Sequence, residues 1–565
     1  MREILLLNLT RMGDIVQKTP TVVGLKELYP GAKVSVLVNT SFAEICNGMP
    51  FIDRVFRLDK SELIKKIRDP NGSLVQKVRE IEQCLAPVRE IEYDLVLNLT
   101  HSRASAILLH LLRTKEIRGI TMDSEGHRLI RHPWMNYFFC AVSNRAYNSF
   151  NLVDMYLKAA GINSRGRVLQ LEVFSEDERF ASNFLGERGI RATDVLIGLQ
   201  PGASNQSRCW PVRNYAALAD RLIREAGAKV IFFGGPGEKS LSETIIKEMK
   251  EAPLEAVAQT TPLQLAALLR RCRVLVSPDT GPMHIATAVG TRVVALFLNT
   301  AFYPETGPYG DGHLVLHSKI SCYPCNFDVE CRHRVCQEDI GVDHVFRAVR
   351  LILSFEPPYA SMEPDGWEQV GVLQSHFDED GLLNYSSVIR RPAERMDLLR
   401  TAYREMWKTF LDQTSREKRP LDEDVQGRFL RGEELVEAPA MMEAAPSLVG
   451  VLERAGSLAE RGMIATQSLF IAATEHPPQA DRIRSLGEEL ETVDEELVLL
   501  GSAHEELRPL VTLFQFGKEN LEGESVADLS RQSHFLYKDL QGQSSMLMNR
   551  LKSLLTKGEC CGRGI

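Results

Sequence analysis

The segment VLVSPDTGPMHIATAVGTRVVALF, residues 274–297, contains two short apolar runs separated by a turn and a helical pattern. The runs 274–279 and 292–297 are continuous rather than alternating, which is typical of strands buried on both faces of a parallel sheet. Between them, Asp-Thr-Gly forms a turn and Pro282 stands at a favourable first position of a helix. The segment therefore predicts a strand–helix–strand unit of a parallel α/β fold.

The same alternation of strand-like and helical patterns extends from the N-terminus to about Phe355. Further strand-like runs lie at 4–9, 33–38, 93–99, 195–202 and 229–235. They form two series, separated by a less regular, helical stretch near 145–190. We therefore predict two doubly wound, Rossmann-like α/β domains, at residues 1–175 and 176–355, that face each other across a cleft.

After Phe355 the composition changes. Residues 356–393 begin with a proline-rich, linker-like stretch and contain a candidate hairpin around Asp380 and Gly381. Residues 394–565 are rich in Leu, Ala, Glu and Arg, and they predict an α-helical bundle domain. Its expected helices are 394–415, 446–473, 479–518 and 526–557.

The bulk composition of the 565-residue chain excludes several classes of protein. With 44% hydrophobic and 25% charged residues, the chain is that of an ordinary globular protein. Its net charge of -8 argues against nucleic acid as a partner, and no apolar stretch approaches the ~20 residues that span a bilayer. Most of the eleven cysteines are scattered, which favours a cytoplasmic protein over a disulfide-stabilised one.

The first strand-like run ends in a turn that carries Gly13 and Asp14. A helical pattern follows, with Pro20 as an irregularity in its early part. Asp14 thus stands at the carboxyl end of a parallel strand, where ligands bind in open α/β sheets. Aspartate is also a good helix cap, so this stretch alone fits either a structural cap or a group that takes part in chemistry.

Two turns of the second domain combine glycines and small residues with a charged side chain. In LQPGASNQSRCWP, residues 199–211, small residues let backbone amides approach an anion, and Arg208 can hold phosphate oxygens. In isolation, that piece is better explained as an ordinary loop with a surface arginine. In FFGGPGEKS, residues 232–240, Glu238 can accept two hydrogen bonds from a vicinal diol such as that of ribose.

A third turn follows Asp279. The Thr280 hydroxyl and the amides around Thr280, Gly281 and Met283 form a nest of donors of the size of a diphosphate. His284, in the helix that follows, either contacts phosphate or packs beneath the turn.

Together these pieces resemble glycosyltransferase family 9, the lipopolysaccharide heptosyltransferases and their relatives. The resemblance covers about residues 1–355 and is most specific in PDTGPMHIATAVGTRVVALF, residues 278–297. It implies a GT-B fold with an acceptor-side N-terminal domain and a second domain that binds a nucleotide-sugar. It also implies inverting transfer that requires no metal or other cofactor.

The resemblance assigns roles to individual residues. Asp14 corresponds to the general base, Glu238 to the ribose-binding carboxylate, and Thr280 with Gly281 to the pyrophosphate-binding turn. Arg208 stands where heptosyltransferases commonly have a lysine that contacts donor phosphate, and this departure leaves the donor sugar open. His284 occupies the place of the family histidine, and we expect Gly13, Asp279 and Met283 to border the donor as well.

One cluster of cysteines, CYPCNFDVECRHRVC, contains Cys322, Cys325, Cys331 and Cys336. A Cys-x2-Cys pair with two further thiols can hold a structural zinc ion or an iron–sulfur cluster. Thiols that pack a loop, or a disulfide, are the alternatives. Four cysteine ligands would leave no open position, so the cluster is not expected to take part in catalysis.

The sequence thus predicts an inverting glycosyltransferase that moves a heptose-like sugar from an ADP-heptose-like donor to a hydroxyl, in lipopolysaccharide or other surface-glycan synthesis. One alternative is a protein O-glycosyltransferase whose helical region recruits a protein acceptor, and another is a non-catalytic adaptor that only binds nucleotide-sugar. A glycolipid acceptor would place the enzyme at the inner face of the cytoplasmic membrane. The helical region is a candidate for self-association, and we expect truncation after about Phe355 to leave donor binding intact.

Overall fold

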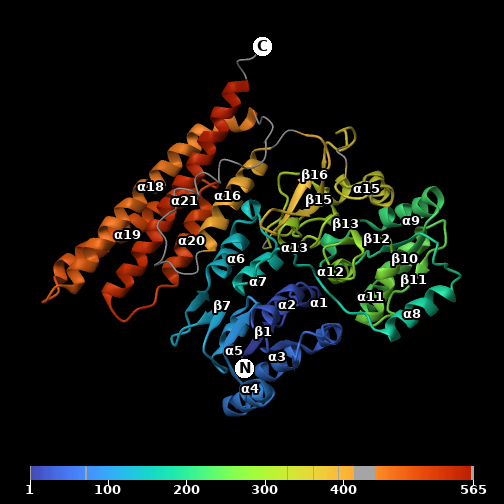
Figure 1. Cartoon of the computed structure of the whole chain (residues 1–565), viewed down its shortest axis with the longest axis horizontal. Helices are drawn as coiled ribbons and strands as arrows, with labels where there is room; N and C mark the ends of the chain where they lie inside the picture. The colour runs from blue at the N-terminus through green and yellow to red at the C-terminus, as the bar shows by residue number, and fades with distance from the viewer. Residues whose placement is uncertain are drawn as a thin grey trace. The chain divides into compact units, whose positions relative to one another are not determined.

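The computed structural model describes residues 2–69, 71, 73–327, 329–359, 362–391, 394–412 and 439–561, with the backbone alone for 67, 439–446 and 554–561. These residues form two compact units. The first unit comprises residues 1–118 and 150–391, and the second comprises 119–149 and 392–565. Figure 1 shows their elements, coloured from blue at the N-terminus to red at the C-terminus.

The first lobe of the first unit is built on parallel strands in the order β3-β2-β1-β5. The strands are β1 (Glu3–Asn8), β2 (Lys33–Asn39), β3 (Arg54–Leu58) and β5 (Leu95–Asn98), and β4 (Glu92–Tyr93) pairs separately with β6 (Arg113–Thr114). The helices are α1 (Met12–Val16), α2 (Thr19–Leu28), η1 (Thr40–Gly48), α3 (Lys60–Arg68), α4 (Leu74–Arg89), α5 (Arg103–Leu109) and α7 (Leu152–Ala159). β1 lies between β2 and β5 and is almost completely buried, which explains its continuous apolar run.

The second lobe is built on an eight-stranded sheet in the order β11-β10-β9-β12-β13-β14-β15-β16. The strands are β9 (Leu196–Leu199), β10 (Lys229–Phe232), β11 (Leu254–Glu255), β12 (Val274–Pro278), β13 (Arg292–Phe297), β14 (Leu314–Ser318), β15 (Val370–Phe377) and β16 (Leu383–Ser387). The strands from β11 to β14 are parallel, whereas β15 and β16 run antiparallel to their neighbours.

Helices join these strands in the right order for a doubly wound lobe. They are α8 (Ser175–Gly186), η3 (Gln206–Arg208), α9 (Val212–Ala226), η4 (Pro236–Glu238), α10 (Lys239–Glu248), α11 (Pro262–Arg271), α12 (Gly281–Ala288), α13 (Tyr303–Thr306), α14 (Val335–Asp339) and α15 (Val342–Ser354). The segment 274–297 forms β12, α12 and β13, as predicted.

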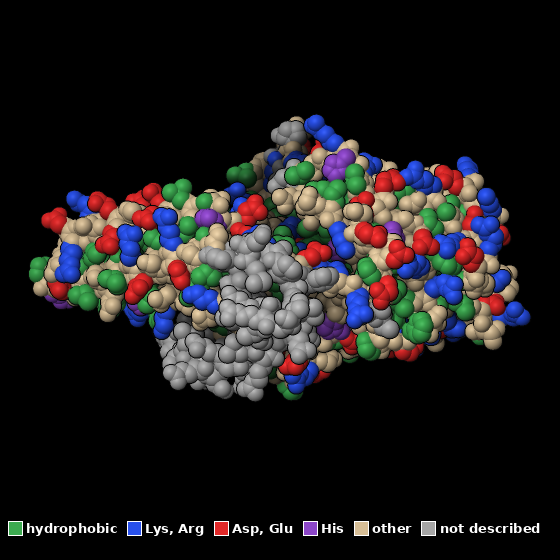
Figure 2. Space-filling model, turned by 90° about the horizontal axis from the view of Figure 1, so that it is seen from above, with side chains coloured by type: hydrophobic (Ala, Val, Ile, Leu, Met, Phe, Trp, Pro, Cys, Tyr) green, Lys and Arg blue, Asp and Glu red, His purple; other side chains and the backbone are tan. Residues whose placement is uncertain are grey.

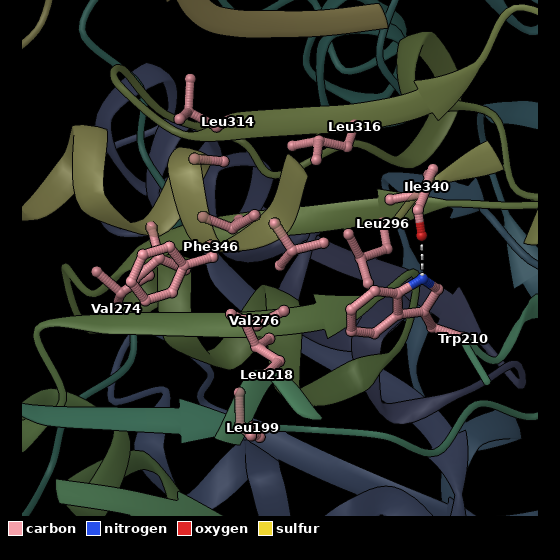
Figure 3. Close-up of a cluster of buried hydrophobic side chains, with 14 of the residues drawn as sticks. Leu199, Trp210, Leu218, Val274, Val276, Leu296, Leu314, Leu316, Ile340 and Phe346 are labelled. Carbon is pink, nitrogen blue, oxygen red and sulfur yellow. Dashed lines mark hydrogen bonds between the residues drawn. The ribbon is translucent and has the colours of Figure 1, made fainter. Parts of the chain in front are cut away.

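The core of the second lobe fills the space between its sheet and two helices. Figure 3 shows side chains of β12, β13 and β14 gathered with Leu218 of α9 and Phe346 of α15. Trp210 closes one end of this cluster, and its indole Nε1 donates a hydrogen bond of 2.7 Å to the carbonyl of Ile340. This packing fixes the loop that precedes α9. That loop carries Arg208, one of the candidate site residues.

The hairpin expected around Asp380 and Gly381 is present as β15 and β16. Gly381 has a φ of +77°, and its amide donates to the carbonyl of Asp378, which closes the turn. The hairpin adds two strands to the sheet of the second lobe through β14. Truncation after Phe355 would therefore remove part of that lobe, so it is a poor test of the helical region.

One expected helix is divided in the structure. The pattern after Asp14 predicts a single helix with Pro20 as an irregularity, but α1 ends at Val16 and α2 begins at Thr19. Pro20 lies in the first turn of α2, where its missing N–H removes no helical hydrogen bond.

The second unit contains five helices among its described C-terminal residues. They are α16 (Arg395–Leu411), α18 (Pro439–Thr474), α19 (Ala480–Ala503), α20 (Arg508–Glu519) and α21 (Val526–Cys561). The expected helix 479–518 is wrong as a single element, since it is divided between α19 and α20 with Pro509 in the first turn of α20. The expected end of the first helix at 415 lies outside the described residues.

A segment from the first half of the chain completes this helical unit. Residues 119–149 contain most of β7 (Ile117–Met122), β8 (Arg128–Arg131), α6 (Pro133–Ser143) and η2 (Arg145–Tyr147). The indole of Trp134 in α6 donates to Asp412 at 2.9 Å, and the amide of Ile130 donates to Asn520 at 2.7 Å. The helical region is therefore packed around residues that lie within the 1–175 expected for the first domain.

The predicted fold class is confirmed. Two Rossmann-like lobes with mainly parallel strands are followed in the chain by an α-helical region. None of the helices in the described part of the chain is both long enough and apolar enough to span a membrane.

Candidate functional site

The turn between β1 and α1 places Asp14 in the first turn of a short helix. The backbone amide of Arg11 donates to Asp14 Oδ2 at 3.0 Å, so the carboxylate does cap α1. Asp14 is nevertheless only half-buried, and its side chain lies at the edge of a cavity. The cap and a chemical role are therefore compatible in this geometry.

A buried lysine lies one turn after Asp14. Lys18 is 3% exposed, its Nζ donates to the carbonyl of Asp14 at 3.0 Å, and it lies 4.7 Å from the ring centroid of Tyr156. Burial lowers the pKa of Lys18 to about 8, with Asp14 opposing the change. Burial also raises the pKa of Asp14, but the charge of Lys18 and the Arg11 amide outweigh it, so the net pKa of Asp14 is lowered.

The loop after β9 positions Arg208 at the end of η3. Arg208 Nε donates to Thr300 Oγ1 at 2.8 Å, and Arg208 Nη1 lies 3.4 Å from Asp279 Oδ2. Both charged side chains are largely buried, with exposed fractions of 14% and 9%. Burial raises the pKa of Asp279, and Arg208 opposes this rise. Arg208 is thus held beside the turn that follows β12, as the sequence predicts for a group that contacts donor phosphate.

The turn between β12 and α12 presents backbone rather than a charged side chain. Thr280 is the N-cap residue of α12, and its side chain makes no capping hydrogen bond. Gly281 and Pro282 form the first turn. The N-terminus of this helix therefore faces the cavity with its positive dipole end and without a side-chain cap, which suits an anion.

The expectation that the Met283 amide is free was wrong. This amide donates to the carbonyl of Thr280 at 3.1 Å, because the turn closes on itself as the helix begins. The Met283 side chain is fully buried, and Met283 does not line the cavity.

His284 lies next to this turn and is 4% exposed. Burial lowers its pKa, against the opposing charges of Asp279 and Asp14, so the ring is neutral at neutral pH. Its Nδ1 has no hydrogen-bond partner among the residues that the structure describes. A buried ring nitrogen of this kind is available to a ligand.

The two turns approach each other closely. A Cβ atom on Gly13 would lie 2.9 Å from the His284 ring and 3.2 Å from the Gly281 Cα, so glycine is needed at this position. The gap beside this contact is a cavity of about 220 Å³. It is lined by Arg11, Gly13, Asp14, Gln17, Ser204, Arg208, Asp279, Thr280, Gly281, His284, Thr300, Glu305, Thr306 and Phe327. Most of the predicted site residues therefore share one cavity.

Glu238 lies on a neighbouring part of the second lobe and does not line this cavity. Its Oε2 accepts a hydrogen bond of 2.7 Å from the Gly235 amide, and Gln200 Nε2 donates to both carboxylate oxygens at 3.2 and 3.3 Å. A Cβ on Gly202 would overlap the carboxylate, so Gly202 makes the room that Glu238 occupies. Gly202 lies two residues before Ser204, a cavity residue, so one loop links Glu238 to the cavity.

The four clustered cysteines lie between β14 and the end of α14, and Cys336 belongs to α14 itself. Cys322, Cys325, Cys331 and Cys336 form no disulfide among the described residues, and Cys336 is buried in the core of the second lobe. Among the described residues, no three His, Cys, Asp or Glu side chains are grouped so that they could hold a metal ion. The structure therefore does not support the zinc or iron–sulfur hypothesis, and the packing of Cys336 favours a structural role.

Several cavity residues were not predicted from the sequence. Arg11 Nη1 donates to Ser204 Oγ at 3.0 Å and so links the two lobes across the cavity. Thr300, Glu305 and Thr306 come from the segment after β13. The sequence does contain one signal for them, since they follow the carboxyl end of a parallel strand beside β12.

Comparison with known proteins identifies the domain. Residues 83–335 match the model of glycosyltransferase family 9 (heptosyltransferase). Lipopolysaccharide heptosyltransferase 3 of Escherichia coli is 25% identical over 288 residues, which cover 50% of this chain and 80% of that protein. Lipooligosaccharide heptosyltransferase 2 of Campylobacter jejuni is 24% identical over 354 residues, which cover 61% and 96%.

A solved glycosyltransferase of family 9 from Veillonella parvula aligns with a TM-score of 0.49 at 23% identity, covering 62% of this chain and 97% of that one. The family match confirms the predicted resemblance: the chain carries a glycosyltransferase family 9 domain and is a glycosyltransferase. The match includes Arg208, Glu238 and the turn after β12, whereas Asp14 precedes it.

Proposed function

We propose that this chain is an inverting, metal-independent glycosyltransferase that moves a heptose-like sugar from a nucleotide-sugar to a hydroxyl acceptor of a lipopolysaccharide core. The observation that carries the proposal is the meeting of two unlike turns in one cavity. The turn before α1 brings a carboxylate, Asp14, and the turn before α12 brings a helix N-terminus beside Arg208. A base and an anion-binding group on opposite sides are what an inverting displacement needs.

Asp14 acts as the general base in this proposal. The acceptor oxygen attacks the anomeric carbon, Asp14 takes the hydroxyl proton, and the bond from that carbon to the diphosphate oxygen breaks. The lowered pKa of Asp14 keeps the carboxylate ionised at neutral pH. A carboxylate with a low pKa is a weak base, so we expect proton transfer to be late, after bond formation has acidified the hydroxyl.

The second lobe stabilises the leaving group. The departing nucleoside diphosphate takes the electron pair of the broken bond, and its negative charge falls at the N-terminus of α12 and near Arg208. The neutral ring of His284 can donate one hydrogen bond to the same oxygens. Glu238, oriented by Gln200 and the Gly235 amide, would accept hydrogen bonds from the ribose hydroxyls.

The acceptor and donor follow from the relatives, which are named as lipopolysaccharide and lipooligosaccharide heptosyltransferases. From those names we infer a heptose-like sugar and a glycolipid core acceptor, and the ADP-heptose-like donor is an expectation from the family resemblance. The residues that line the cavity suit a sugar ring beside a diphosphate. They include the hydroxyl side chains of Thr300 and Thr306 and the carboxylate of Glu305, which can form hydrogen bonds with sugar hydroxyls.

The test is transfer by the purified full-length chain from ADP-heptose to a lipopolysaccharide core acceptor, with other nucleotide-sugars and a protein acceptor as comparisons. We expect transfer in the presence of a chelator, and an anomeric configuration opposite to that of the donor, which NMR of the product would show. Retention of configuration, or activity abolished by the chelator and restored by a metal, would contradict the proposed mechanism. Transfer to the protein acceptor alone would show that the acceptor is a protein and not a lipopolysaccharide core. Donor binding without transfer or hydrolysis would indicate a non-catalytic adaptor.

A further inference from the structure

Gln17 is a buried polar residue of the cavity that has no role in the reaction proposed above. It is the C-cap residue of α1, it lines the cavity, and it is 1% exposed. Its side-chain Nε2 has no hydrogen-bond partner among the residues that the structure describes. A buried amide donor without a partner is unfavourable for folding, because it has lost its hydrogen bonds to water and gained none from the protein. A ligand oxygen in the cavity would satisfy this donor.

The position of Gln17 on α1 places its side chain beside the proposed base. The backbone amide of Gln17 donates to the carbonyl of Gly13 at 3.0 Å, so the helical backbone continues through this residue. Asp14 and Gln17 are three residues apart, which puts their side chains next to each other on one face of the helix, with Cβ atoms about 5–6 Å apart. Both residues line the same cavity. A carboxylate and an amide at this spacing can bind two neighbouring oxygen atoms of one ligand.

The next residue, Lys18, has its side chain engaged with the protein. Its Nζ donates to the carbonyl of Asp14 at 3.0 Å and lies 4.7 Å from the ring centroid of Tyr156. Lys18 is not among the residues that line the cavity, whereas Gln17 is. Lys18 therefore acts on Asp14 through contacts within the protein, and the amide of Gln17 is available to a ligand.

The lobe and the charge of Gln17 indicate which ligand it contacts. Gln17 belongs to the first lobe with Asp14, whereas Arg208 and the turn before α12, which suit a diphosphate, belong to the second. An uncharged amide suits the oxygens of a sugar, with which it can both donate and accept hydrogen bonds. On the face drawn in Figure 2, the acidic and basic side chains of the described residues are interspersed, which agrees with recognition of the acceptor inside the cavity rather than by surface charge.

We propose that Gln17 binds the acceptor sugar, with its Nε2 donating a hydrogen bond to an oxygen next to the hydroxyl whose proton Asp14 takes. This inference rests on the proposed function, because it requires that the first lobe holds the acceptor. Gln17 orients the attacking oxygen toward Asp14 and the anomeric carbon, and it takes no part in the bonds that form and break.

The experiment compares the full-length chain with its variant Gln17→Met, which keeps an unbranched side chain and removes its hydrogen bonds. Titration calorimetry with a deacylated lipopolysaccharide core oligosaccharide, in the presence of ADP, measures acceptor affinity without turnover. We expect Gln17→Met to weaken acceptor binding by about threefold to tenfold, the usual effect of one neutral hydrogen bond, and to leave nucleotide-sugar affinity unchanged. Without ligands, its melting temperature should equal or exceed that of the unmodified chain, because the unpaired buried donor is gone.

The matched control is Gln76→Met, which makes the same change at an exposed glutamine of α4 in the same lobe and should leave acceptor affinity unchanged. A second variant, Gln17→Glu, keeps the shape of the side chain and replaces the donor by an oxygen. It should weaken acceptor binding at neutral pH at least as much as Gln17→Met, and it decides the question if Gln17→Met does not fold.

The outcomes separate this inference from the proposed function. Acceptor affinity unchanged in both Gln17 variants, or a loss of nucleotide-sugar affinity alone, would overturn the contact between Gln17 and the acceptor. Absence of oligosaccharide binding by the unmodified chain would overturn it as well. Oligosaccharide binding without transfer by the unmodified chain would contradict the proposed function, while the affinities of the variants would still decide the role of Gln17.

Discussion

The turns before α1 and α12 follow strands at different places in their sheets, β1 in the first lobe and β12 in the second, and their chemistry is opposite. Each follows a buried parallel strand and opens a short helix toward the same cavity. The first turn is capped by its own carboxylate, since Asp14 accepts the Arg11 amide. The second has no side-chain cap at Thr280, and the nearest acidic group, Asp279, is paired with Arg208.

This difference separates the two halves of a group transfer. A helix start that carries a carboxylate repels a diphosphate and can accept a proton, whereas an uncapped helix start beside an arginine attracts an anion. The same backbone element thus serves as a proton acceptor in one lobe and as an anion site in the other. The comparison predicts that substitutions in the two turns affect different steps of the reaction.

The largest effect is expected from Asp14→Asn. The amide oxygen of asparagine can accept the same hydrogen bond from the Arg11 amide, so the variant should fold normally. It cannot accept the hydroxyl proton, and we expect kcat to fall by about 10²–10⁴-fold while donor affinity changes little. Steady-state kinetics and a donor titration measure the two quantities. Near-normal turnover would leave Asp14 with the role of a cap alone.

The next effect is expected from Arg208→Ala in the opposite lobe. Loss of a charged hydrogen-bond donor should weaken nucleotide-sugar binding by about 1.5–3 kcal/mol. The matched control is Arg213→Ala, which removes an exposed arginine that pairs with Glu338 on the surface of the same lobe. Titration calorimetry measures the donor affinity of both variants. Equal donor affinity in the two would remove Arg208 from the donor site.

A smaller loss of donor affinity is expected from Glu238→Ala. The carboxylate is half-exposed, so its contribution should lie in the lower part of the range of about 1.5–3 kcal/mol for a charged hydrogen bond. The exposed Glu243→Ala on α10 serves as the control. The loss should be seen for the nucleoside diphosphate and absent for inorganic diphosphate, which has no ribose. An equal loss for both ligands would argue against a ribose contact.

The smallest effect at neutral pH is expected from Lys18→Met, which sharpens the account of Asp14. Lys18 lowers the pKa of Asp14 against the raising effect of burial, so its removal should raise that pKa. The base is active when ionised, and the acidic limb of the pH profile of kcat/KM should therefore move to higher pH. Lys26→Met, which removes a lysine of α2 that pairs with Asp53, should leave the pH profile unchanged. An unmoved acidic limb in Lys18→Met would contradict this role.

Local signals predicted much of the fold. In the segment 274–297, for example, the two continuous apolar runs form β12 and β13, and Pro282 lies in the first turn of α12 between them. The division between α19 and α20 was missed, since the pattern of apolar residues continues through it. Neither the joining of β15 and β16 to the second sheet nor the packing of residues 119–149 with the helical region could be predicted, because both depend on contacts between residues far apart in the chain.

The site was predicted where chemistry coincides with a strand end. Asp14, Arg208, Asp279 and Thr280 all follow strands, and the structure brings them to one cavity. Lys18 was missed because a lysine inside a helical pattern gives no sign that it is buried. For the cysteine cluster, the spacing suggested a metal site, but among the described residues no three His, Cys, Asp or Glu side chains are grouped so that they could hold a metal ion.

The central claim is that the two turns act on different steps, and the dependence of the single-turnover transfer rate on donor concentration tests it most directly. For Asp14→Asn, the account predicts a plateau rate lowered by about 10²–10⁴-fold with an unchanged half-saturating donor concentration. For Arg208→Ala, it predicts an increase in that concentration. A shift in half-saturation without a lower plateau in Asp14→Asn would contradict the assignment of Asp14 as the base.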